Sequence, residues 1–192
     1  MQTSGWDFAG LRTTPLDSGG LGLWGELLNN TGQPQIINTV SGTFYNDQGQ
    51  VIASPESTSG VWPVDLTQPG ERIPFKLTIT NIQAAAHFEL SVAATPGTAT
   101  TRHDFQFTGL VESIQAGDYC LTGTLQNPDD ELQNSLIIGL VLYDDQNKIV
   151  NFSSYNELYF AGVTGEQMLD FEICVPPPNQ NVARYELRAW GQ

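Results

Sequence analysis

Basic residues are scarce in this chain of 192 residues. Lysine and arginine together number 7 against 21 aspartates and glutamates, which gives a formal net charge of −14. Lys76 and Lys148 are the only lysines. Binding to the phosphates of DNA or RNA depends on clustered cations, and so does attraction to an anionic lipid surface. We therefore expect no nucleic-acid partner and no membrane-surface partner.

Long apolar runs, helical patterns and catalytic motifs are also missing. The sequence has no run of about 18 apolar residues, so no membrane insertion is expected. No segment repeats apolar residues at the three- and four-residue spacing of an amphipathic helix. There is no GxSxG elbow, and neither His87 nor His103 has a metal-ligating neighbour at a useful spacing. We predict a protein that is not an enzyme; a hydrolase site assembled from distant residues stays an alternative.

Two stretches read as β-hairpins, namely residues 42–52 (GTFYNDQGQVI) and residues 139–150 (GLVLYDDQNKIV). In each, aromatic and β-branched residues flank a short polar turn, a pattern typical of paired strands. The turns end on Gly49 and Asn147, residue types that tolerate a positive φ angle. Both stretches are therefore predicted to be strand–turn–strand units.

The two hairpins belong to a longer internal repeat. The same offset separates Gly25 from Gly123 and Tyr45 from Tyr143, and similar offsets relate matching residues on either side. A repeat of this length indicates two whole domains. The prediction is an all-β protein of two tandem antiparallel immunoglobulin-like β-sandwich domains, at residues 1–94 and 103–192, joined by a linker at 95–102. In the first domain the patterns predict strands at 6–12, 21–28, 37–46, 50–53, 61–66, 73–80 and 87–93.

The repeated motifs resemble those of the FxLYD family, a small immunoglobulin-like β-sandwich of bacterial and archaeal envelope and secreted proteins. Its pattern is a strand ending in GxxxN, an FxLYD hairpin and a PGE…PF turn and strand. The chain matches it at residues 25–29, 123–127, 69–75 and 142–144, although Leu140 replaces the leading phenylalanine of the second hairpin. Generic immunoglobulin-like or fibronectin-like modules are the alternative. The resemblance implies an exported protein, extracellular or at the cell surface, and carries over no catalytic residues.

Cys120 and Cys174 are the only cysteines, and both lie in the second repeat. Each is out of step with the apolar residues of its strand, so both should point away from the core. In this fold class the two strands are expected to be antiparallel neighbours. We predict a cross-strand disulfide on the outer face, unlike the inward-pointing bridge of antibody domains. Two free thiols in a reducing compartment are the alternative.

Asp129, Asp130 and Glu131 form the densest acidic cluster, and Asp104 enters from the linker. Calcium takes six to eight oxygen ligands, so one hypothesis is a calcium ion held by these four residues. The other interpretation is a solvated acidic turn without a cofactor, which is the commoner state of such a cluster.

Trp24 falls on the outward face of its strand, and Trp190 lies near the C-terminus. Exposed aromatic rings stack on sugars or bind partner proteins, so these two are the predicted ligand-binding residues. Partial burial is the alternative. The first function hypothesis is a spacer or structural module of a larger envelope or surface protein, with that protein's other domains as partners. The second is a binding module for a carbohydrate or protein ligand.

Overall fold

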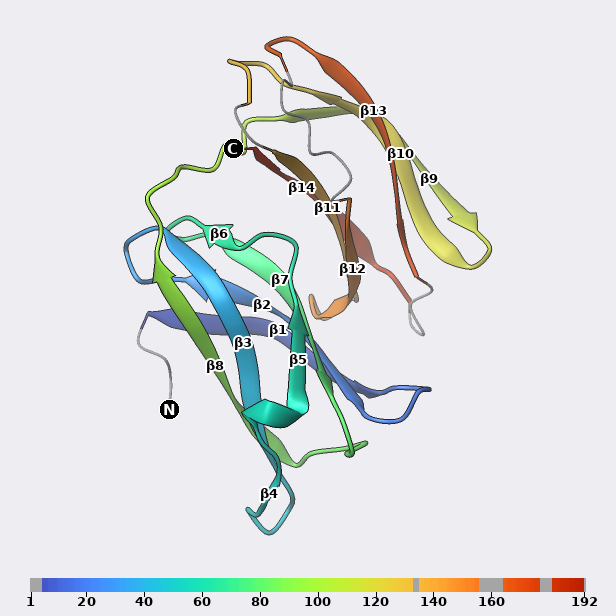
Figure 1. Ribbon diagram of the computed structural model, residues 1–192. Coiled ribbons are helices and arrows are strands. Elements are labelled where there is room, and N and C mark those ends of the chain that lie inside the picture. The colour runs from blue at the N-terminus through green and yellow to red at the C-terminus, as the bar shows by residue number, and fades with distance from the viewer. Residues whose placement is uncertain (1–4, 133–134, 156–163, 177–180, 192) are drawn as a thin grey trace. The chain divides into compact units, whose positions relative to one another are not determined.

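The computed structural model describes residues 5–132, 135–155, 164–176 and 181–191 (Figure 1). The protein is all-β, with antiparallel sheets, and within those ranges the single helical segment is one 3₁₀ turn, η1 (Pro55–Ser57). No helix in the described ranges is long and apolar enough to cross a membrane. The chain forms two compact units, Met1–Ala99 and Thr100–Gln192, and each is described by itself.

The first unit contains two antiparallel sheets. One has the strand order β1 (Trp6–Pro15), β2 (Leu21–Asn29), β7 (Arg72–Ile79), β5 (Thr58–Val61). In the other, β3 (Gln35–Tyr45) pairs with β4 (Val51–Ala53), β6 (Leu66–Thr67) and β8 (His87–Pro96). Alternate residues of β2 are apolar, and Leu23 and Leu27 are fully buried, as are Phe75 on β7 and Phe44 on β3. The core is thus built from alternating positions of both sheets, as in a β-sandwich.

The second unit repeats this plan with six described strands. One sheet has the order β13 (Met168–Val175), β10 (Asp118–Gln126), β9 (Gln106–Gln115), and the other has β12 (Ile149–Tyr155), β11 (Leu136–Tyr143), β14 (Arg184–Gly191). The core again draws on both sheets, with Leu121 and Leu125 of β10 packed in one cluster with Leu140 and Leu142 of β11. Strand β11 is the central strand of its sheet and is buried along most of its length. This burial accounts for its strongly apolar sequence, which is what makes the strand predictable.

Matched aromatic pairs occur at the same place in both units. Phe8 and Phe75 meet edge to face, with ring centroids 5.7 Å apart and an interplanar angle of 70°. Phe107 and Phe171 do the same at 5.6 Å and 77°. These four residues are the ones that the repeat aligns in the sequence, so the two units share core contacts as well as strand order.

The asparagine that ends each GxxxN segment is buried and bonds to backbone carbonyls of a distant segment. Asn29 and Asn127 are both completely buried. The side-chain amide of Asn29 donates to the carbonyl oxygen of Thr67 at 3.2 Å, and that of Asn127 donates to the carbonyl of Thr164 at 3.3 Å. The Asn29 amide thus links the end of β2 to β6, and the Asn127 amide links the end of β10 to the turn before β13, so both buried side chains have hydrogen-bond partners.

Both predicted hairpin turns are confirmed. Gly49 and Asn147 have positive φ angles of 73° and 58°. The side-chain oxygens of Asn46 and Asp144 each accept two backbone N–H groups of their turn, at 2.9–3.0 Å. An asparagine or aspartate at this position therefore closes the turn, which explains why both residue types occur there.

Two details of the sequence prediction are wrong. Residues 61–66 do not form one strand, because β5 ends at Val61 and β6 begins at Leu66. Pro63 lies between them and has no N–H group to donate to a sheet, which accounts for the interruption. The predicted linker also begins too early, since Thr95 and Pro96 continue β8 and pair with β3.

Candidate functional site

The disulfide between Cys120 and Cys174 is the most distinctive chemical feature of the second unit. It joins β10 to β13 at directly opposed positions, with 4.0 Å between the two Cα atoms and a sequence separation of 54. Leu121 and Ile173, the next residues along each strand, point into the core, so the bridge lies on the opposite, outer face. Cys120 is nevertheless completely buried, which the sequence pattern did not indicate.

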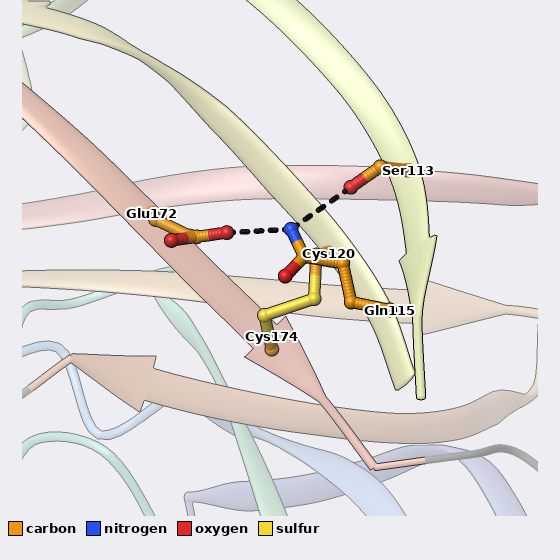
Figure 2. Close-up of a disulfide and its surroundings, with 5 residues drawn as sticks. All are labelled: Ser113, Gln115, Cys120, Glu172 and Cys174. Carbon is orange, nitrogen blue, oxygen red and sulfur yellow. Dashed lines mark hydrogen bonds between the residues drawn. A yellow bond between two sulfur atoms is a disulfide. The ribbon is translucent and has the colours of Figure 1, made fainter. Parts of the chain in front are cut away.

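A polar side chain crosses beside the bridge, as Figure 2 shows. The amide nitrogen of Gln115, at the end of β9, donates to the carboxylate of Glu172 at 2.6 Å and to the hydroxyl of Ser113 at 3.3 Å. The three residues come from β9 and β13, the two neighbours of β10, so this network ties together the strands on both sides of Cys120. Of the two cysteines, Cys120 is buried and Cys174 is half-buried.

Glu172 places a negative charge next to the disulfide. One of its carboxylate oxygens lies within 4.8 Å of both sulfur atoms. Thiol–disulfide exchange begins with attack by an anionic thiolate. A neighbouring carboxylate repels that thiolate, and burial of Cys120 restricts its approach further. The arrangement therefore suits a persistent structural bridge better than an exchanging, redox-active one.

In the described ranges, Cys120, Cys174 and Glu172 are also the one group of three ligand-type side chains close enough to share a metal ion. The two sulfur atoms are bonded to each other, so they are not available as thiolate ligands. His103 contributes instead to local structure, because its Nδ1 atom lies 3.1 Å from the carbonyl oxygen of Ala189. His87 stacks on Tyr45 with ring centroids 4.4 Å apart.

The acidic residues proposed as calcium ligands are organised by an arginine. Arg102 donates to both carboxylate oxygens of Asp104, at 3.0 and 2.8 Å, and to the backbone carbonyl of Asp130 at 2.7 Å. It also donates to the side-chain oxygen of the buried Asn127 at 2.8 Å. A guanidinium thus takes the Asp104 oxygens that a cation would need, and the calcium hypothesis for Asp104, Asp129, Asp130 and Glu131 is not supported by this geometry.

The arginine also sets the charge state of its partner. The Arg102 hydrogen bonds hold the pKa of Asp104 below its ordinary value, against the opposing effect of partial burial. Asp104 is therefore ionised over the whole neutral range, and the ion pair remains intact there. The sequence alone did not single out Arg102, because its role depends on a turn that lies far along the chain. The signal available in the sequence was an arginine two residues before Asp104.

The two tryptophans predicted to bind a ligand are not exposed. Trp24 is 8% exposed and Trp190 is 2% exposed. Each indole occupies the space above a glycine, because a Cβ atom built at Gly22 would lie 2.3 Å from the Trp24 ring and one at Gly139 would lie 2.7 Å from the Trp190 ring. The Lys76 ammonium also lies 5.1 Å from the Trp24 ring centroid. The expectation that the two rings are exposed is wrong, since neighbouring glycines let the rings pack against their sheets. Their role in ligand binding stays a prediction.

Comparison of the sequence with known protein families found no match, and comparison with curated proteins found none either. The geometry of the chain itself is therefore the basis for a proposal about function.

Proposed function

We propose that this chain is a non-catalytic structural module of an exported protein, built from two FxLYD-type immunoglobulin-like sandwiches and located outside the cell or at its surface. The Cys120–Cys174 disulfide is the observation that carries the proposal. Disulfides of this persistent kind form in oxidising compartments and are rare in the cytosol. Its position on a sheet face, shielded by a hydrogen-bonded glutamine, supports a stabilising role.

The distribution of polar groups supports the same function. The buried asparagines Asn29 and Asn127, and the ion pair between Arg102 and Asp104, all hold loops of their own unit. Side chains of these types are frequent in active sites, but here their hydrogen bonds go to backbone carbonyls and to one another. A module whose polar residues are used in this way is suited to separating or supporting other domains.

The export proposal is tested in the organism that makes the protein. Cells are quenched in acid, free thiols are alkylated, and the intact mass of the protein is measured before and after reduction. We expect no alkylation before reduction and two alkyl groups after it. Digestion of intact cells with a protease that cannot enter them should remove the protein. Two alkylated cysteines in the unreduced sample, or full protection from the protease with the thiols free, would overturn the proposal.

A further inference from the structure

Among the described residues, strand β9 lies at the edge of its sheet, with no strand paired to its outer side. The strand order is β13-β10-β9, and among the described residues β9 forms a ladder with β10 alone. An edge strand presents a row of backbone N–H and C=O groups that can pair with another extended chain. Whether β9 can do so depends on which of its groups face outward and on what its side chains place beside them.

The hairpin that joins β9 to β10 shows which groups face outward. Its two-residue loop has positive φ angles of 52° at Ala116 and 97° at Gly117, which is a type I′ turn. The flanking pair, Gln115 with its partner on β10, is therefore a hydrogen-bonded pair, and such pairs alternate along an antiparallel ladder. It follows that Ser113 bonds to β10, whereas Glu112 and Ile114 direct their N–H and C=O groups away from the sheet.

The disulfide gives the same answer independently. Directly opposed residues whose backbone groups are not bonded to each other have the shorter Cα separation, typically about 4.5 Å. The 4.0 Å between the Cα atoms of Cys120 and Cys174 identifies a pair of this kind. Cys120 therefore bonds on its other side, to Ser113 of β9, with which it is in register. The outward direction of the Ile114 N–H thus rests on two observations.

The equivalent edge of the first unit is blocked, whereas that of β9 is not. Each edge strand has a glycine with positive φ, Gly10 at 59° in β1 and Gly109 at 63° in β9, and the repeat aligns these two residues. Pro15 follows Gly10 by the same number of residues as Ile114 follows Gly109, so the two positions correspond. A proline has no N–H to offer an added strand and is a common device for protecting an edge. The second unit has an isoleucine there, with 68% of its surface exposed.

The surroundings of this edge are apolar and acidic. Val111, like Ile114, is largely exposed. Strands β9, β10 and β13 contain no lysine or arginine, but they carry Glu112, Asp118, Asp170 and Glu172. Pairing with a second copy of the same edge would bring together two sheets of like charge, which is unfavourable. Charge complementarity favours a strand with basic residues on the face of Asp118, Asp170 and Glu172, and the exposed Ile114 on the opposite face favours apolar residues between them.

We propose that residues 111–115 of β9 form a docking site for an extended segment of a partner protein in which basic and apolar residues alternate. The segment adds to the sheet as a new strand through the backbone groups of Glu112 and Ile114, and it covers the Ile114 side chain. The chemistry is main-chain hydrogen bonding supplemented by apolar contact and by attraction to the acidic sheet. The proposed docking site does not depend on where the protein is located. Its test is therefore independent of the test of export.

The test uses the full chain and a labelled peptide of five Val-Lys repeats, with binding followed by fluorescence anisotropy at low salt. One control peptide has glutamate in place of lysine. A second keeps every side chain of the Val-Lys peptide but has methylated amide nitrogens along one edge of its backbone. We expect saturable binding of the Val-Lys peptide alone, together with slower hydrogen exchange at the amides of Glu112 and Ile114 in the complex.

The variant Ile114→Pro imports the block that Pro15 provides in the first unit, and it should weaken binding at least tenfold. The matched variant Ile114→Thr keeps the N–H group and should weaken binding only a few-fold. Intact disulfide formation and native hydrogen-exchange protection of β10 and β13 serve as folding checks for both variants. The methylated peptide tests the same hydrogen bonds without any change to the protein, so the experiment remains decisive if Ile114→Pro does not fold.

Three outcomes would overturn the proposal. Equal binding of the methylated peptide would show charge attraction without strand addition. An absence of binding by the Val-Lys peptide at millimolar concentration would show that the edge is not a docking site. Concentration-dependent dimerisation of the protein that Ile114→Pro abolishes would identify a second copy of the chain as the occupant instead of a basic partner.

Discussion

Removal of the disulfide should destabilise the second unit and leave the first unchanged. The perturbation is the double substitution Cys120→Ala and Cys174→Ala. The bridge closes a loop with a sequence separation of 54, and the chain-entropy relation for such a loop gives about 4 kcal/mol at 25 °C. Measured effects are often smaller than this relation predicts, so the expected loss is about 2–4 kcal/mol in the free energy of unfolding of the second unit.

The first unit supplies an internal control for this experiment. Gly22 and Thr78 are directly opposed in β2 and β7, and the repeat aligns them with the two cysteines. They carry no cross-link, and the first unit contains no cysteine. The substitution therefore removes a constraint from one unit and alters nothing in the covalent structure of the other.

The assay is hydrogen exchange measured by mass spectrometry, because peptides from each strand report on each unit separately. A loss of about 2–4 kcal/mol corresponds to exchange that is about 30- to 1,000-fold faster for the most protected amides of β10 and β13. Amides of β2 and β7 should exchange at the wild-type rate. Unchanged exchange in β10 and β13 would refute the loop-entropy reasoning, and an equal acceleration in all four strands would refute the assignment of the effect to one unit.

Three further predictions concern the loops and the hairpin of the second unit. Asn127→Ala removes a buried side chain that bonds to the Thr164 and Asp130 carbonyls and to Arg102, so urea unfolding should show a loss of about 2–3 kcal/mol. The exposed control Asn30→Ala removes one surface hydrogen bond to Asp7 and should lose about 1 kcal/mol or less; equal losses would contradict this. The ionised form of Asp104 is favoured in the folded state, so its stabilising effect is present at neutral pH and is lost as the pH falls through its lowered pKa. Arg102→Met should raise that pKa in carbon-detected NMR titrations, and added calcium should leave the wild-type titration unchanged; a pKa that does not move in the variant would contradict the assignment. Ala116→Gly relieves a left-handed backbone conformation and should stabilise the second unit by about 0.5–1 kcal/mol; a lower urea midpoint would show that the turn is not strained.

Much of the fold is predictable because strands and turns are encoded locally. Alternation of apolar residues identifies β2 and β10, and turn residues such as Gly49 and Asn147 mark the hairpins. The repeat then adds information, since each pattern occurs twice and the copies check each other. The outward direction of the two cysteines followed from the same alternation, because a period of two residues fixes the face on which each side chain lies.

The errors arise where a residue's environment depends on another part of the chain. Trp24 lies on the outward face, as its position predicts. Gly22 has no side chain, so the indole ring packs against the sheet there and is buried. In the acidic cluster, composition suggested a bound calcium ion, but the carboxylate of Asp104 is paired with Arg102. Neither outcome can be read from spacing along one strand, because each requires knowledge of which side chains meet across the fold.

The position of the disulfide would have a mechanical consequence in the proposed role as a structural module between other domains. A chain pulled by its ends can lengthen by about 3.3–3.6 Å for each residue released. The disulfide transmits the pulling force directly from Cys120 to Cys174. The segment between these residues, a separation of 54, is therefore not extended. The second unit would therefore yield roughly 180–195 Å less extension than its length allows. Reduction of the disulfide would add this length to the unfolded chain, so the bridge determines the maximum extension of the second unit.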